Sequence, residues 1–226
     1  MFLKIQNTKL SSTKFLENQK SSKVAISVII SLILLANLGY SYVTIEVITT
    51  GNSVDIILEN LKSPFSDKIN PNKSDLNNIV TILENQPDIE NSYVMANYIF
   101  GLPGDTKETM KKTFDLSLEL CTAGWNTYAA MALPGSQLYK NALEKKYKLP
   151  ESYEGYSFHS YETQPLPTET LKPEEILEYR DKSFINYHTD KTFLDKIERK
   201  FGQRALGNIK DMTKVNLKRK ILGDQL

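Results

Sequence analysis

The clearest pattern along the chain is a predicted strand, glycine turn and helix over Tyr93–Thr106, with the sequence YVMANYIFGLPGDT. Successive side chains of a strand point to opposite faces, so the pattern divides the strand into two sets: Met95, Asn97 and Ile99 on one face, and Ala96, Tyr98 and Phe100 on the other. Two glycines bracket a proline and allow a sharp turn. Asp105, followed by Glu108, predicts the N-cap and capping box of the next helix. Asn97 is polar within an apolar strand, which indicates either a local hydrogen bond or a ligand.

An uncharged, apolar stretch lies nearer the N-terminus. No charged residue occurs from Val24 to Ile45, and the densest apolar part, VAISVIISLILLA, covers Val24–Ala36. A buried helix followed by a strand is the favoured interpretation, and a membrane anchor with Lys20 and Lys23 at its cytoplasmic end stays open. The apolar part is about 13 residues long, whereas a helix needs roughly 20 to span a bilayer.

Strand and helix patterns alternate through the rest of the chain. The β-branched run Tyr42–Asn52 predicts a strand and turn. Two amphipathic helices should follow, with apolar positions Val54, Ile57, Leu58 and Leu61 in the first and Leu76, Ile79, Val80 and Leu83 in the second. Beyond Asp105, the pattern predicts a helix ending at Gly124, a strand over Asn126–Leu133, a helix over Leu138–Lys146, a connection over Leu149–Pro173, a helix over Pro173–Tyr187 and a basic helical remainder. Strands joined by helices predict an α/β fold with a parallel sheet or barrel, whose ligands bind at the carboxyl ends of the strands.

Three of the helices predicted after Asp105 have residues that we expect to pack inward. These are Met110, Phe114, Leu118 and Cys121 in the first, Ile176, Tyr179, Phe184 and Ile185 in the next long one, and Phe193, Leu194, Ile197 and Phe201 in the last. We expect Cys121 to be a core residue rather than a reactive thiol.

Composition excludes several classes of function. The net charge of the 226 residues is +1, which does not indicate a nucleic-acid partner. The local excess of basic residues over Lys191–Lys220 favours a solvated helix surface over a nucleic-acid or phospholipid contact. A single cysteine allows no intramolecular disulfide, structural zinc site or iron–sulfur cluster, and favours a cytoplasmic protein. The two histidines, His159 and His188, are expected at the surface or in local hydrogen bonds.

Three segments in this order resemble the radical SAM superfamily. ANYIFGLPGDT and AAMALPGSQLY are similar to the fifth and sixth strands of its barrel, and YVTIEVITTGNS is similar to the fourth. The similarity is closest to members that often carry an upstream cobalamin-binding domain. It implies a partial, or half, radical SAM-type βα barrel with parallel strands and a helical C-terminal extension. The implied division is a poorly ordered segment over 1–23, the partial barrel over 24–148, and the loop and helical extension over 149–226.

The resemblance also implies a partial site for S-adenosylmethionine. Asn97 matches the position that hydrogen-bonds the ribose, Ile99 the residue that packs on the adenine, and Met131 the neighbouring-strand position beside that base. Gly101 would allow the backbone to approach the ligand closely. Plain core packing explains Ile99 and Met131 equally well.

Several departures from the family pattern imply that the chain is inactive alone. The family binds a [4Fe–4S] cluster through a CxxxCxxC motif, and this motif does not occur here. Thr49 stands where the family has a glutamate that pairs with the ammonium group of the ligand. The residues before Tyr42 are too few for the three preceding βα units, each of about 30 residues. We therefore expect no catalytic residue and no metal ligand in this chain.

Three hypotheses follow. The first is a truncated or split radical SAM protein, completed by an N-terminal half-barrel on another chain. The second is a non-catalytic half-barrel that binds another protein or a second copy through its open sheet edge. The third is a small protein anchored in the membrane through residues 24–45.

Overall fold

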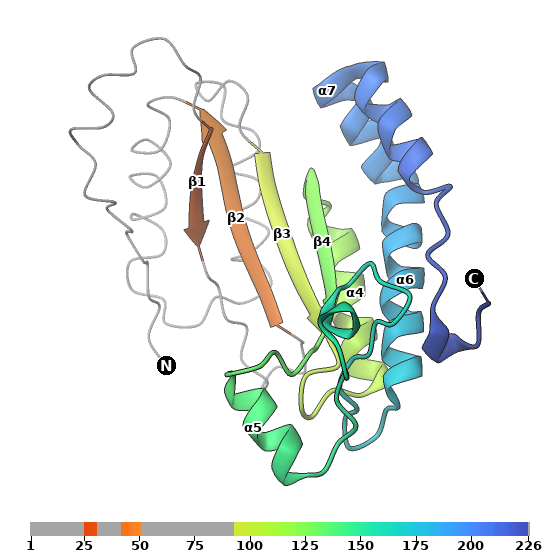
Figure 1. Ribbon diagram of the computed structural model, residues 1–226. Helices are drawn as coiled ribbons and strands as arrows, with labels where there is room; N and C mark the ends of the chain where they lie inside the picture. The colour runs from red at the N-terminus through yellow and green to blue at the C-terminus, as the bar shows by residue number, and fades with distance from the viewer. Residues whose placement is uncertain (1–24, 31–41, 51–92, 226) are drawn as a thin grey trace, which may run out of the picture. The chain divides into compact units, whose positions relative to one another are not determined.

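The computed structural model describes residues 25–30, 42–50 and 93–225 (Figure 1). The poorly ordered segment predicted over residues 1–23 and the two helices predicted between Asn52 and Leu83 lie outside these ranges. The described strands are β1 (Ala25–Ile30), β2 (Tyr42–Thr50), β3 (Tyr93–Phe100) and β4 (Gly124–Ala129). The α-helices are α4 (Lys107–Leu120), α5 (Gln137–Glu144), α6 (Pro173–Thr189) and α7 (Lys191–Met212), with short 3-10 helices η2 (Tyr153–Tyr156) and η3 (Lys220–Leu222).

The chain divides into two compact units, and the boundary falls within β3, between Asn97 and Tyr98. The first unit includes β1, β2 from Val43 onward and β3 as far as Asn97. In this unit β1 pairs antiparallel with β2, from Ala25 opposite Thr50 to Ile30 opposite Ile45.

The antiparallel pair corrects two predictions. Ala25–Ile30 is a strand and not part of a helix, and the described strands are not all parallel. The physical reason is composition, because four of the six residues in AISVII are β-branched and favour an extended chain. None of the helices in the described part of the chain is long and apolar enough to cross a membrane.

The second unit contains the end of β3 (residues 98–100), α4 and β4, which form a βαβ arrangement. β3 and β4 are hydrogen-bonded neighbours, run parallel and are joined by α4. Figure 1 shows α4 and α6 on the same side of these two strands. The α/β class is therefore confirmed, and the barrel stays a prediction because the described sheet has four strands, of which β1 and β2 are antiparallel.

The side of the sheet that faces the helices forms the core. Phe100 of β3 and Ala129 of β4 pack with Met110, Leu171 and Ile176. A second, aromatic part of the core surrounds Trp125, whose ring stacks on Tyr187 with centroids 4.7 Å apart. The six-residue strand β4 begins two residues before its predicted start, which places Trp125 in this layer.

Helix α4 is buried differently from the prediction. Met110 is buried, but Phe114 and Leu118 are only half-buried, and the helix ends at Leu120 with Cys121 buried at its C-cap in a left-handed conformation. Thr113 and Ser117 are buried instead. Their hydroxyls donate to the carbonyls of Thr109 and Phe114, which satisfies them inside the core.

The predictions for α6 and α7 hold in part. Ile176, Phe193 and Ile197 are buried, whereas Tyr179, Phe184, Ile185 and Leu194 are half-buried. Phe201 is 41% exposed, so its predicted inward position is wrong. The reason is a kink in α7 at Gly202, where φ is 81° and ψ is 178°. His188 is buried, with Nδ1 2.8 Å from the carbonyl oxygen of Phe184, which is the predicted local hydrogen bond.

Candidate functional site

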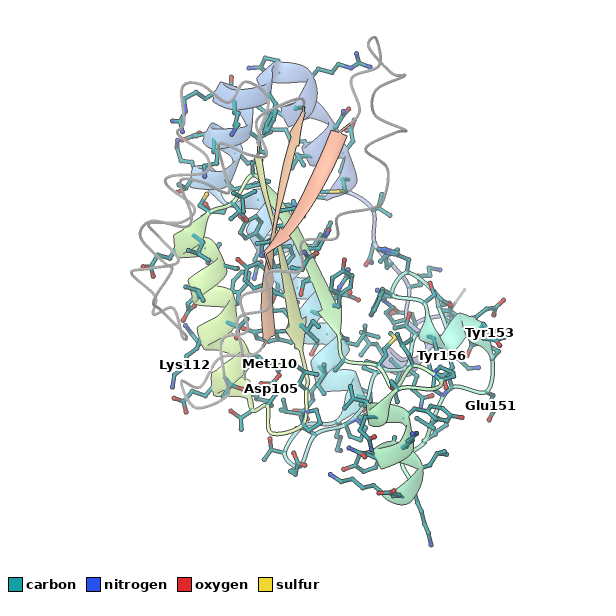
Figure 2. The ribbon with its side chains drawn as sticks, turned by 90° about the vertical axis from the view of Figure 1, so that its left-hand side faces the viewer. Asp105, Met110, Lys112, Glu151, Tyr153 and Tyr156 are labelled. Atoms are coloured by element: carbon teal, nitrogen blue, oxygen red, sulfur yellow. The ribbon has the colours of Figure 1, made fainter. Side chains whose placement is uncertain are left out.

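The turn after β3 is held together by Asp105. Its carboxylate accepts hydrogen bonds from the backbone N–H groups of Gly101 (2.9 Å) and Leu102 (3.0 Å) and from the hydroxyl of Thr109 (2.9 Å). Asp105 is 6% exposed and lies at the beginning of α4 (Figure 2). A buried carboxylate that accepts three hydrogen bonds fixes the backbone of the turn in one geometry.

Asp105 is therefore not the N-cap of α4, as the sequence pattern predicted. The N-cap is Thr106, whose hydroxyl accepts from the N–H of Thr109, while the Thr109 hydroxyl accepts from the N–H of Thr106. This reciprocal pair forms the capping box without Glu108. The carboxylate of Asp105 reaches back to the turn, which leaves the shorter threonine next in sequence to cap the helix.

The segment before α6 also contacts this turn. The Thr168 hydroxyl donates to the carbonyl of Asp105 (2.9 Å), and the N–H of Gly104 donates to the Glu169 carboxylate (3.0 Å). The pKa of Glu169 is lowered mainly by hydrogen bonds that its carboxylate accepts from its own backbone N–H and from the N–H of Gly104. A hydrogen bond from the Lys145 side chain lowers this pKa further. The turn is thus attached to residues more than 60 positions later in the chain.

Gly101 has a reason to be glycine that does not involve a ligand. Its φ is +80°, which side chains other than glycine rarely adopt. A Cβ atom there would lie 2.6 Å from Cγ2 of Ile176. The predicted close approach of a ligand to this backbone remains a prediction.

The two sets of β3 side chains that the alternating pattern distinguished differ in exposure. Val94, Ala96, Tyr98 and Phe100 are all 0% exposed. Asn97 and Ile99 are half-buried and share the opposite face. Asn97 is the last residue of the first unit, and Ile99 belongs to the second.

The remaining predicted residue, Met131, follows β4. It is 6% exposed and lies beyond the end of the strand, which stops at Ala129 rather than at Leu133. The N–H of Ala130 donates to the carbonyl of Phe100 at 2.8 Å. This bond brings the carboxyl ends of β3 and β4 together, so Ile99, Gly101 and Met131 lie at the same end of the parallel pair.

The register of the two strands identifies a residue that sequence reasoning missed. Phe100 and Ala129 belong to the same core cluster, on the helix side of the sheet. The preceding residues, Ile99 and Tyr128, therefore lie next to each other on the opposite face. Tyr128 is half-buried, and the Phe158 ring packs on it with centroids 4.9 Å apart. The alternation within Gly124–Ala129 could have placed Tyr128 on this face, but nothing local indicates Phe158.

This arrangement suits a planar apolar group better than a metal centre. Ile99 and Tyr128 provide an apolar and an aromatic surface on the same face, a combination that can pack against a planar apolar group. A [4Fe–4S] cluster does not fit, because the one cysteine of the sequence is buried at the end of α4. Among the residues that the structure describes, no group of three His, Cys, Asp or Glu side chains could hold a metal ion. Thr49, which stands where the family pattern has a glutamate, lies in β2, within the first unit.

Comparison with protein-family models, with curated proteins and with solved structures finds no match.

Proposed function

We propose that this chain contributes strands to the S-adenosylmethionine-binding half of a radical SAM-type barrel and acts with a polypeptide that supplies the cluster cysteines. The observation that carries the proposal is the two-sided β3–α4–β4 unit. One side of its strands is buried under helices, and the other presents Ile99 beside Tyr128 at the end where βα proteins bind ligands.

Each predicted residue has a role that its chemistry can perform. The amide of Asn97 can hydrogen-bond a ribose hydroxyl, and the half-buried Ile99 can pack on a purine. Met131 offers a flexible apolar side chain at the same end of the pair. In the family, the cluster cleaves S-adenosylmethionine reductively; the residues of this chain would bind and orient the ligand and would leave that chemistry to the partner.

Calorimetric titration of the full chain with S-adenosylmethionine tests the proposal. We expect measurable binding by the wild type and binding weakened about two- to tenfold by Asn97→Ala, the effect of losing one hydrogen bond. Asn186→Ala is the matched control, because Asn186 is exposed on α6. Absence of binding by the wild type, or equal effects of the two substitutions, would contradict a retained adenosyl site.

Reconstitution with iron and sulfide tests the need for a partner. We expect no cluster signal in the EPR spectrum of the chain alone, since one cysteine cannot replace three. A signal that survives Cys121→Ser would overturn this part of the proposal.

A second candidate is a non-catalytic half-barrel that binds a complementary chain or a second copy. It is favoured by the exposure of Leu133 (50%) and Leu143 (55%), near the carboxyl ends of the strands and on α5. Sedimentation measures whether the chain associates with itself. A well-folded monomer that binds S-adenosylmethionine would support the first candidate and contradict self-association.

A further inference from the structure

Arg219 is a fully buried side chain whose guanidinium makes five hydrogen bonds. Nε and Nη2 donate to the two carboxylate oxygens of Asp181, at 2.9 and 3.1 Å. Nη1 donates to the carbonyl of Ser160 (2.8 Å) and the hydroxyl of Thr163 (3.0 Å), and Nη2 also donates to the carbonyl of Phe158 (2.9 Å). A guanidinium at 0% exposure is stable only when its donors are satisfied in this way.

These bonds attach the end of the chain to a loop far away in the sequence. We call residues 157–163 the aromatic loop and residues 218–225 the C-terminal segment. Beyond Arg219, the N–H of Lys220 donates to the carbonyl of Tyr161 (2.9 Å), and the Tyr161 hydroxyl donates to the carbonyl of Asp224 (2.7 Å). Lys220 also forms an ion pair with Glu162 at 2.9 Å. The two segments are therefore bonded along their length, with Arg219 as the buried centre.

The aromatic loop in turn contacts the face of β4 that carries the candidate site. The carbonyl of Phe158 is a partner of Arg219, and its ring packs on Tyr128 at an interplanar angle of 56°. Tyr128 lies beside Ile99, on the face opposite the helices. A continuous chain of contacts thus runs from Arg219 through Phe158 to Tyr128.

We propose that Arg219 is a positioning residue, which holds Phe158 on Tyr128 so that the two rings form an aromatic wall beside Ile99. This proposal rests on the proposed function, because the wall would contact the adenine of the same ligand. It adds Tyr128 and Phe158 to the binding residues and gives the C-terminal segment a part in building the site. Aromatic rings bind a purine by stacking, which adds to the apolar contact that Ile99 makes.

Hydrogen–deuterium exchange of the full chain tests the positioning role without any ligand. We expect Arg219→Ala to raise amide exchange in the aromatic loop by about tenfold or more, because the loop loses its buried partner. Arg219→Lys should give a smaller increase in the same peptide, since a lysine keeps the charge and loses the paired donors. Lys218→Ala is the control, because Lys218 is exposed and bonds only within the C-terminal segment. Emission of Trp125, which lies in the helix-side core, should stay unchanged if the variants fold.

The exchange experiment decides the positioning role of Arg219 separately from the aromatic wall. Unchanged exchange in the aromatic loop of both arginine variants would overturn the positioning role. An arginine variant that does not fold, as shown by shifted Trp125 emission, would assign Arg219 to the stability of the whole fold and would also overturn it.

Titration with S-adenosylmethionine and with adenosine tests the aromatic wall. We expect Phe158→Ala to weaken binding of both probes by about fivefold or more, the effect of losing one stacked ring, and Lys218→Ala to leave it unchanged. Wild-type binding that Phe158→Ala does not alter would overturn the wall and leave the proposed function standing. Absence of wild-type binding would overturn the wall together with the proposed function, while the exchange experiment would still decide the role of Arg219.

Discussion

Gly101, at the end of β3, faces Ile176 in the first turn of α6 so closely that no side chain fits between them. A Cβ atom on Gly101 would meet three carbon atoms of Ile176, the nearest two at 2.6 and 2.8 Å. Contacts under 3 Å between carbon atoms force either the Ile176 side chain or one of the two segments to move. The glycine therefore fixes how near α6 can lie to the carboxyl end of the parallel pair.

We expect Gly101→Ala to destabilise the fold by about 2–5 kcal/mol, the sum of backbone strain at positive φ and overpacking against Ile176. Urea unfolding followed by the emission of Trp125, the one tryptophan of the chain, measures this change. Gly104→Ala is the control, because Gly104 has φ +90° and nothing within 4 Å of its added Cβ. That control should cost only about 1–2 kcal/mol, from backbone strain alone. Equal losses in the two variants would contradict the steric explanation.

The second prediction concerns Asp105, whose carboxylate holds the turn. Asp105→Ala should lower the free energy of unfolding by about 2–4 kcal/mol, because two backbone N–H groups of the turn lose a charged acceptor. Asp115→Ala, on the same helix, is the matched control: its carboxylate is exposed and pairs with Lys111. Such a surface pair contributes about 0.2–0.5 kcal/mol. The same urea titration measures both, and a loss below about 1 kcal/mol for Asp105→Ala would contradict its role in the turn.

The sequence predicted those features that depend on neighbouring residues. The alternation in Tyr93–Phe100 identified both faces of β3, because a strand has a period of two and one of its faces is buried. Pro173 marked the start of α6, since proline is favoured in the first turn of a helix. The apolar run at Val24–Ala36 was less informative, because a short apolar segment suits a strand and a buried helix equally.

Features that depend on distant residues could not be predicted in this way. Arg219 contacts Asp181 and Phe158, which lie 38 and 61 positions earlier, and no local pattern marks such a partner. The role of Asp105 was missed for a related reason. An aspartate before a helix can either cap it or reach back to the preceding turn, and the choice depends on the conformation of that turn.

A third prediction tests the packing of α6 on the sheet. The hydroxyl of Tyr187, at 0% exposure, donates to the carbonyl of Thr122 at 2.7 Å. Tyr187→Phe removes this bond and keeps the ring stacked on Trp125, so we expect a loss of about 1–2 kcal/mol. Tyr153→Phe should change stability by less than about 0.5 kcal/mol, because Tyr153 is 89% exposed. Similar losses in the two variants would show that the buried bond adds nothing to stability.

His188 makes the stability of the fold depend on pH. Burial, as the largest cause, lowers the pKa of its imidazole below the ordinary value of 6.5, and the nearby charge of Arg180 acts in the same direction. The hydrogen bond to Phe184 opposes these effects and does not outweigh them. The folded protein therefore keeps the ring neutral at a pH where the unfolded chain already binds a proton.

The sign of the effect follows from this difference in bound protons. Stability from the neutral ring is fully present above pH 6.5 and falls as the pH drops from 6.5 toward the lower pKa of the folded state. For a single proton, the slope of stability against pH is at most about 1.36 kcal/mol per pH unit.

Urea unfolding at about pH 7.5 and about pH 5 tests this dependence. Between the two pH values, we expect the wild type to lose more free energy of unfolding than His188→Gln, which cannot titrate. Carboxylates that titrate in the same range contribute equally to both proteins and cancel in the comparison. An identical pH dependence in the wild type and His188→Gln would mean that the buried ring is protonated as readily in the folded state as in the unfolded chain.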